Sequence, residues 1–167
     1  SGFSPQIDPE LTGRSGAFGW DVADGLWRLK VAAFGYRRFT STTLKVPPPV
    51  TGLRLRLRQD PAQQRLLIDP RGRVGKLVLG GKAFRVPGLQ VTVRAGRVVA
   101  IAVRSRRFQT AFGIHLGSRE DDLLRAYPEP TTEALLRRHA KSLPRYHVSR
   151  ATFAVRHGRI VGITLGR

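Results

Sequence analysis

The sequence predicts a mainly β protein in which a partial β-sandwich is followed by an antiparallel sheet with short helices. Apolar and basic residues alternate with period two, glycine-centred turns recur between apolar runs, and one stretch has a helical pattern. We expect the sandwich, complete or incomplete, at residues 1–58. An α+β module of β-hairpins and short helices is expected at residues 59–167.

Strands are expected in the first module at residues 17–22, 25–36 and 52–59. Asp24-Gly25 is typical of a hairpin turn between the first two. In the third, leucine and arginine alternate, which places an apolar side against a cationic side. The arginines concerned are Arg54, Arg56 and Arg58.

An internal repeat dominates the second module. Residues 93–103 (VRAGRVVAIAV) align with residues 155–165 (VRHGRIVGITL) at an offset of 62, with six of eleven positions identical. A looser copy spans residues 69–79. Each copy predicts a strand, a tight turn at glycine and a second strand, because such turns need a positive φ.

One helix is expected between the last two hairpins. Ser118 is in position to cap it, and Glu120, Asp121 and Asp122 lie in its first turn. An apolar side of Leu123, Leu124 and Tyr127 follows, and Pro128 ends the helix. A second helix is expected at about residues 133–141.

The charge is strongly basic and uneven. Thirty Lys and Arg residues against eleven Asp and Glu give a net charge of +19, and residues 51–108 alone carry fourteen basic and two acidic residues. This concentration favours an anionic partner. The best binding candidates are the alternating arginines and a second run, with a merely solvated cationic face as the alternative: Arg54, Arg56, Arg58, Arg104, Arg106 and Arg107.

Trp20 and Trp27 are a candidate aromatic platform for sugar stacking. Core filling is favoured over this hypothesis, because Trp27 is in register with Leu29 and Val31.

No catalytic, metal or cofactor site is expected. Cysteine is absent, the four histidines have no ligand spacing, and the acidic run at 120–122 suits a helix start. Ser118 lacks a nucleophile-elbow motif. No apolar run approaches eighteen residues, so no transmembrane segment is expected.

Residues 4–58 resemble the later strands of carboxypeptidase-regulatory-like (transthyretin-like, Cna-B-like) β-sandwich domains. The resemblance implies a non-catalytic spacer or binding unit, whose opening strands precede Ser1 or come from another chain. It is carried by Trp20, Asp21, Val22, Gly25, Trp27, Leu29, Gly35, Tyr36 and residues 46–53.

Residues 70–167 resemble the module shared by β-lactamase-inhibitory proteins and small outer-membrane-assembly lipoproteins. The usual glycine after the tyrosine is missing, because Pro128 follows Tyr127 directly. This resemblance implies binding to proteins or the cell envelope. It is carried by Gly113, Ile114, Leu116, Gly117, Leu123, Tyr127, Pro128 and residues 158–160.

Together these features predict a secreted or cell-surface, non-catalytic module that recognises an anionic cell-wall polymer, membrane surface or acidic protein. One alternative is a structural subunit of an extracellular assembly or filament, completed by strand exchange with another chain. A further alternative is nucleic-acid binding, which the charge permits but no motif supports.

Overall fold

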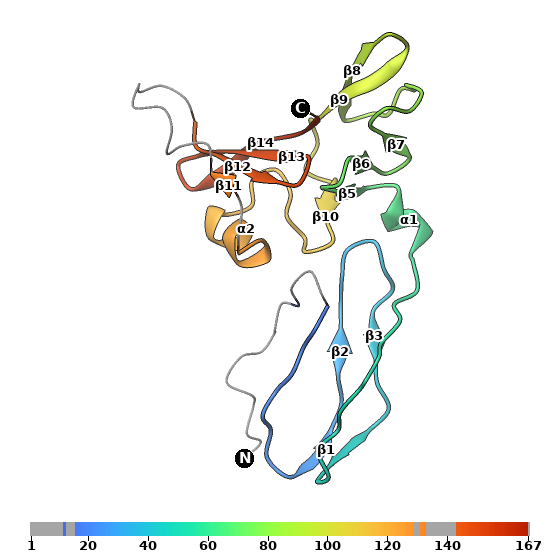
Figure 1. The fold of residues 1–167 in the computed structure, drawn as a ribbon, viewed down its shortest axis with the longest axis vertical. Coiled ribbons are helices and arrows are strands. Elements are labelled where there is room, and N and C mark those ends of the chain that lie inside the picture. Colours follow the sequence, from blue (N-terminus) through green and yellow to red (C-terminus); the bar gives the residue numbers. More distant parts are fainter. Residues whose placement is uncertain (1–11, 13–15, 129–130, 133–142, 167) are drawn as a thin grey trace.

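The computed structural model describes residue 12 and residues 16–128, 131–132 and 143–166. The fold is mainly β, as the sequence predicted, with two short helices among the described residues. Figure 1 shows a lower arm made of residues 16–60 and an upper body made of residues 61–166. The expected helix at 133–141 lies outside the described residues.

The arm contains two small antiparallel pairs. Strand β1 (Gly25–Trp27) pairs with β4 (Leu44–Val46), and β2 (Lys30–Val31) pairs with β3 (Phe39–Thr40). The expected strand at 17–22 is not part of any described ladder, so Asp24-Gly25 is not a hairpin turn. Strand β1 instead finds its partner in β4, about twenty residues downstream.

Residues 53–58 are also not a ladder strand, although their alternation is real. Leu53, Leu55 and Leu57 are half-buried, and the arginines between them are exposed. A single bridge, between Tyr36 and Gln59, ties the end of this segment to the rest of the arm.

Two larger sheets build the body. The four-stranded sheet has the order β10-β5-β6-β7 and comprises β5 (Leu67–Asp69), β6 (Arg73–Val74), β7 (Leu77–Val78) and β10 (Gln109–Thr110). The six-stranded sheet has the order β11-β12-β13-β14-β9-β8. Its strands are β8 (Leu89–Arg94), β9 (Arg97–Val103), β11 (Thr131–Thr132), β12 (Arg145–Val148), β13 (Ala151–Arg156) and β14 (Arg159–Gly166).

The repeat is confirmed at the level of individual backbone angles. Hairpins β8–β9 and β13–β14 both turn on two residues of positive φ, Ala95-Gly96 and His157-Gly158. Both carry a register shift at the equivalent place, after Thr92 and after Ala154. The looser third copy also forms a hairpin, β5–β6, but its second strand has only two residues.

One apolar core fills the body, between the six-stranded sheet on one side and the four-stranded sheet and α2 on the other. Phe108 and Phe153 are its largest fully buried side chains. No apolar side chain among the described arm residues is buried to this degree. The arm and the body therefore differ sharply in how well they are packed.

The two helices begin differently. Helix α1 (Pro61–Gln64), which was not predicted, is capped by the carboxylate of Asp60, which accepts from the amides of Ala62 and Gln63. Helix α2 (Glu120–Ala126) has the expected acidic first turn and ends just before Pro128.

The expected cap by Ser118 is wrong. Its hydroxyl accepts from the His115 amide at 3.0 Å, so Arg119 becomes the N-cap without a side-chain bond. Within the predicted apolar side, Leu123 is buried, Tyr127 is half-buried and Leu124 is exposed.

Gly35 is the point at which the arm is fastened to the body. Its amide donates to Gln63 Oε1 at 3.0 Å, and its carbonyl accepts from the Asp60 amide and from Gln64 Nε2. The neighbouring Phe34 amide donates to the Ala111 carbonyl at 2.8 Å. Gly35 is buried with a φ of 94°, which favours glycine.

Replacing Gly35 by alanine should loosen this junction. A Cβ there would lie 3.0 Å from Gln64 Nε2 and 3.1 Å from Leu67 Cδ2, in addition to the strain of a positive φ. We expect the free energy of unfolding to fall by about 1–3 kcal/mol in urea denaturation.

Gly52→Ala is the matched control. Gly52 also has a positive φ, 67°, but a Cβ there meets no atom within 4 Å. It should cost about 1 kcal/mol. Equal losses for the two variants would show that the close packing around Gly35 contributes nothing.

Candidate functional site

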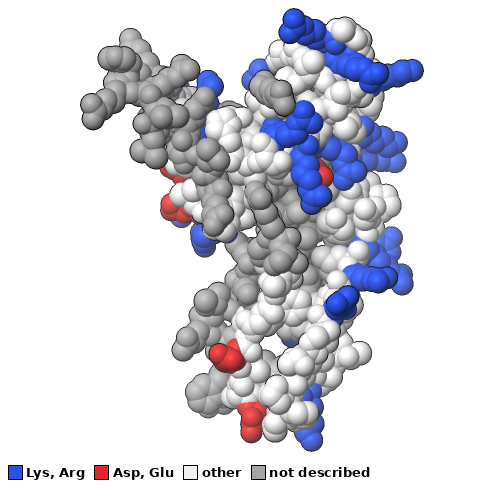
Figure 2. Space-filling view, viewed as in Figure 1, with Lys and Arg blue, Asp and Glu red and all other residues white. Residues whose placement is uncertain are grey.

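Positive charge is spread along one edge of the molecule. In Figure 2 the Lys and Arg side chains follow the right-hand edge, from the β8–β9 hairpin at the top to the arm at the bottom. Acidic side chains gather mainly at the left, near α2 and on the arm. Among the described residues, ion pairs join Arg71 and Arg73 to Asp69, and Arg125 to Asp122.

Arg54, Arg56 and Arg58, which we call the arginine row, are three exposed side chains on one extended segment of the arm. The leucines between them point to the other side and are half-buried. The three guanidinium groups form no hydrogen bond or ion pair with another described residue. Alternate residues of an extended segment lie about 7 Å apart, so the row presents regularly spaced donors.

The second predicted group is held differently. Arg104 bonds Gln90 Oε1 through Nε at 3.1 Å and through its terminal nitrogen at 2.6 Å. Arg107 donates to the Pro87 carbonyl at 2.8 Å and lies 5.6 Å from the centre of the Phe108 ring. Arg106 is exposed, with its guanidinium beside Gly117.

The structure does not join the two groups into one cluster. The arginine row belongs to the arm, whereas Arg104, Arg106 and Arg107 lie on the connection between β9 and β10 in the body. No hydrogen bond links the side chains of the two groups. Any joint action would require a ligand long enough to reach both.

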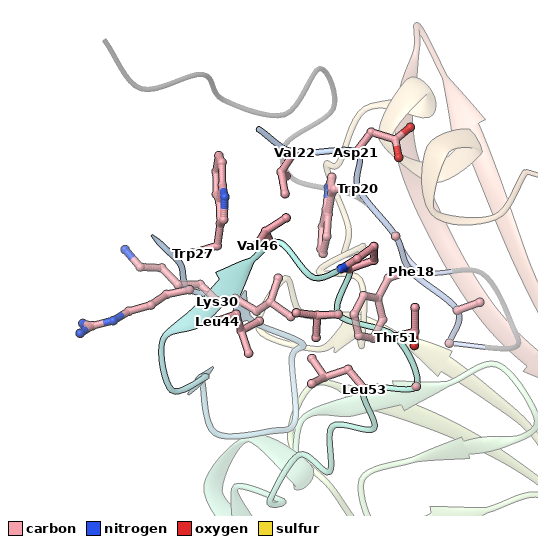
Figure 3. A pocket seen from close by; sticks show the side chains of 18 residues that line it. Phe18, Trp20, Asp21, Val22, Trp27, Lys30, Leu44, Val46, Thr51 and Leu53 are labelled. Atoms are coloured by element: carbon pink, nitrogen blue, oxygen red, sulfur yellow. The ribbon is translucent and has the colours of Figure 1, made fainter. Parts of the chain in front are cut away.

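A pocket of about 1020 Å³ lies in the arm, and both tryptophans line it. Figure 3 shows Trp20, Trp27, Val46 and Leu53 around it. The walls come from residues 16–22, 27–30 and 49–53, together with Leu44 and Val46. Sequence reasoning missed Phe18, whose ring centre lies 5.8 Å from that of Trp20; the spacing in Phe18-Gly19-Trp20 was the available signal.

Both tryptophans are half-buried, and the platform for sugar stacking stays a prediction. Trp27 Nε1 donates to the Ala23 carbonyl at 2.9 Å, which leaves its ring as a wall of the pocket. The predicted register holds, because Trp27, Leu29 and Val31 are all half-buried while the residues between them are exposed. The apolar side of the arm is thus formed but incompletely covered.

Titratable groups do not converge on a reactive centre in the described part of the chain. No three His, Asp or Glu side chains there are grouped to hold a metal ion. The His115 ring contacts the Leu116 carbonyl, and the His147 ring contacts the Thr152 hydroxyl at 3.0 Å. Neither described helix has the length and apolar character to cross a bilayer.

Two tyrosines are perturbed for structural reasons. Burial raises the pKa of Tyr127 above its usual 10.0. Tyr146 on β12 donates a hydrogen bond to the carboxylate of Glu120 on α2, and this bond, with smaller effects of burial and of the same negative charge, raises its pKa to about 12. The pair ties α2 to β12.

A scan of protein-family models, a search of curated proteins and a search of solved structures each found no match to this chain.

The Tyr146 bond should be visible in a spectrophotometric titration. Because the folded-state pKa is raised, the bond should stabilise the fold fully below pH 10 and lose that effect between pH 10 and about 12. Phenolate absorbance should show one tyrosine titrating near 12, absent in Tyr146→Phe. Glu120→Gln should move that transition toward 10; an unchanged transition would contradict the assignment.

Proposed function

We propose that this chain is a secreted or cell-envelope, non-catalytic binding module that recognises an anionic partner through its cationic edge. The arginine row carries the proposal. Its three guanidinium groups are exposed, evenly spaced and without described partners, on a chain of net charge +19. Structural arginines are normally engaged with carboxylates or carbonyls, as Arg104 and Arg107 are with an amide oxygen and a carbonyl.

The chemistry of the row fits phosphate, sulfate or carboxylate groups repeated along a polymer or surface. Arginine offers a planar fork of donors that matches such oxyanions with two bonds at once. Salt should weaken the complex, because exposed charges are screened beyond about 8–10 Å at physiological ionic strength.

The assignment to the cell exterior rests on the two sequence resemblances. Carboxypeptidase-regulatory-like domains and the inhibitory-protein and lipoprotein module both occur in exported proteins that bind other molecules. The β-hairpins and the two short helices among the described residues of the body are compatible with the second resemblance.

Removing the row should weaken binding beyond the effect of net charge. We expect the triple variant Arg54→Gln, Arg56→Gln, Arg58→Gln to bind poly(glycerol phosphate) at least tenfold less tightly, with a shallower dependence on salt. The matched control changes Arg38, Lys76 and Arg156 to Gln, three exposed cations in separate parts of the chain. Equal losses in the two triple variants would contradict a localised site.

The same titration separates the candidate partners. Vesicles of anionic lipid, poly-glutamate and duplex DNA are compared with the wall-type polymer across the salt series. A preference for DNA that persists at high salt would favour the nucleic-acid alternative.

The half-covered arm supports a second candidate function, a structural subunit completed by another chain. The apolar side chains that line the pocket are all partly exposed, as in a sheet that lacks its second layer. A strand or face contributed by a neighbour would cover them.

Tryptophan fluorescence should report such completion directly, because Trp20 and Trp27 are the two tryptophans of the chain and both line the pocket. Assembly predicts a blue shift of emission with rising protein concentration, in step with a rise in native mass. Leu44→Glu, in the pocket wall, should abolish both changes, and Leu124→Glu, on exposed α2, should not. A strict monomer with constant emission would count against assembly.

A further inference from the structure

The six-stranded sheet contains two copies of one unit related by a local two-fold axis. In the antiparallel pairing of β9 with β14, Ile163 lies opposite Val103 and Leu165 lies opposite Ile101. At the offset of 62, Ile163 is equivalent to Ile101 and Leu165 to Val103, so each pair becomes the other when the two units are exchanged. The axis therefore passes between Ala102 and Thr164, which lie opposite each other and are themselves equivalent.

The equivalence extends beyond the hairpins. Arg97 donates to the Gly80 carbonyl at 2.8 Å, and its equivalent Arg159 donates to the Gly117 carbonyl at 3.0 Å. The backbone bonds around them repeat as well. The backbone of Val98 bonds the Gly80 amide and the Gly81 carbonyl, and the backbone of its equivalent Ile160 bonds the Gly117 amide and the Ser118 carbonyl in the same way. The bond from the Arg104 amide to the Gly88 carbonyl is likewise repeated by the bond from the Gly166 amide to the Arg150 carbonyl.

The units differ in the connection that follows. In the second unit 32 residues (119–150) join Ser118 to Ala151, and they include α2, β11 and β12. Strand β12 pairs with β13 and closes that side of the hairpin. In the first unit seven residues (82–88) join Gly81 to Leu89, too few to form a helix and return as a strand. Strand β8 consequently ends the sheet.

The missing cover is evident in the exposure of equivalent residues. Val155 in the second unit is 1% exposed, and Val93 in the first is 47% exposed. Phe84, on the short connection, is 45% exposed. The first unit thus presents an open strand edge beside uncovered apolar side chains, on the hairpin that projects from the body in Figure 1.

The free backbone groups can be assigned from the register. The Arg104 amide bonds the Gly88 carbonyl, so the backbone groups of Gly88 face the β9 side. The backbone groups of successive residues alternate in direction along a strand, so the amides of Gln90 and Thr92 also face β9. Those of Leu89 and Val91 then face outward. The Leu89 amide already bonds the Val86 carbonyl, so the edge left without a partner among the described residues begins at Val91 and continues to Val93.

The surroundings of this edge are cationic. Arg85, Arg94, Arg97 and Arg104 are all exposed on the hairpin or beside it. Pairing of β8 with β8 of a second copy would bring these like charges together and is therefore disfavoured. An acidic strand would meet complementary charge instead.

We propose that the outer edge of β8 accepts an extended, acidic segment of a partner protein as an added strand, in the position that β12 occupies in the second unit. This rests on the proposed function, because it specifies the anionic partner as a protein strand. Side chains equivalent to Tyr146 and Val148 of β12 would be apolar and face the core side. The residues that alternate with these apolar positions, equivalent to Arg145 and His147, would be acidic and lie on the face that carries Arg94 and Arg104.

The test uses a synthetic peptide that alternates Glu with Val and Tyr, titrated into the full chain. The apolar positions have their amides facing β8, as Tyr146 and Val148 do toward β13. N-methylation of the apolar residues should weaken binding at least tenfold, and N-methylation of the Glu residues should have little effect. Equal effects of the two modifications, or no binding, would overturn the proposal.

A protein variant provides an independent control. Arg94→Glu should weaken peptide binding about tenfold, whereas Arg156→Glu, the equivalent position in the closed unit, should not. Amide hydrogen exchange should slow at Val91 and Val93 when the peptide is present. Slowing of these amides with protein concentration alone would indicate pairing of two copies and would refute the proposal.

The arginine row separates this inference from the proposed function. The triple row variant should bind the peptide normally, because the row lies on the arm. If the peptide does not bind but the arginine row still binds a polyanion, the added strand is overturned and the proposed function is not. Peptide binding that depends on the row but not on Arg94 also overturns it.

Discussion

The pairing of β9 with β14 is the interaction on which the body depends. Each hairpin alone buries one face only partly, and a two-stranded hairpin is marginal in water. Joining the two hairpins around Ala102 and Thr164 creates a sheet wide enough for the four-stranded sheet and α2 to pack against it. The core residues Ile101, Val103, Ile163 and Leu165 are all supplied by this one contact between strands.

The arm has no comparable source of stability. Its ladders are two or three residues long, and its apolar side chains remain half-exposed around the pocket. It is held to the body by hydrogen bonds at Gly35 and Phe34, where the backbone passes too close to Leu67 for a side chain. The best-formed candidate binding surface therefore sits on the least packed part of the molecule, as is common for sites that a partner completes.

Local patterns predicted the hairpins well and the long-range pairing poorly. Gly96 and Gly158 marked both turns correctly, because turn chemistry is set by adjacent residues. The expected hairpin at Asp24-Gly25 did not form, and β1 pairs with distant β4 instead, a choice that alternation cannot reveal. Ser118 occupies a position typical of a helix cap, but its hydroxyl accepts a hydrogen bond from the His115 amide instead. The arginine row was visible in the sequence, whereas the open β8 edge follows only from comparing the two connections in space.

Among the described residues, the uneven placement of charge in Figure 2 amounts to an electric dipole, with acidic side chains near α2 toward one end and the cations along the edge that carries the β8–β9 hairpin toward the other. A dipole of this kind experiences a torque in the field of a charged surface. The chain would therefore turn its cationic edge toward an anionic target while still a Debye length away, and fewer encounters would be spent on the wrong face.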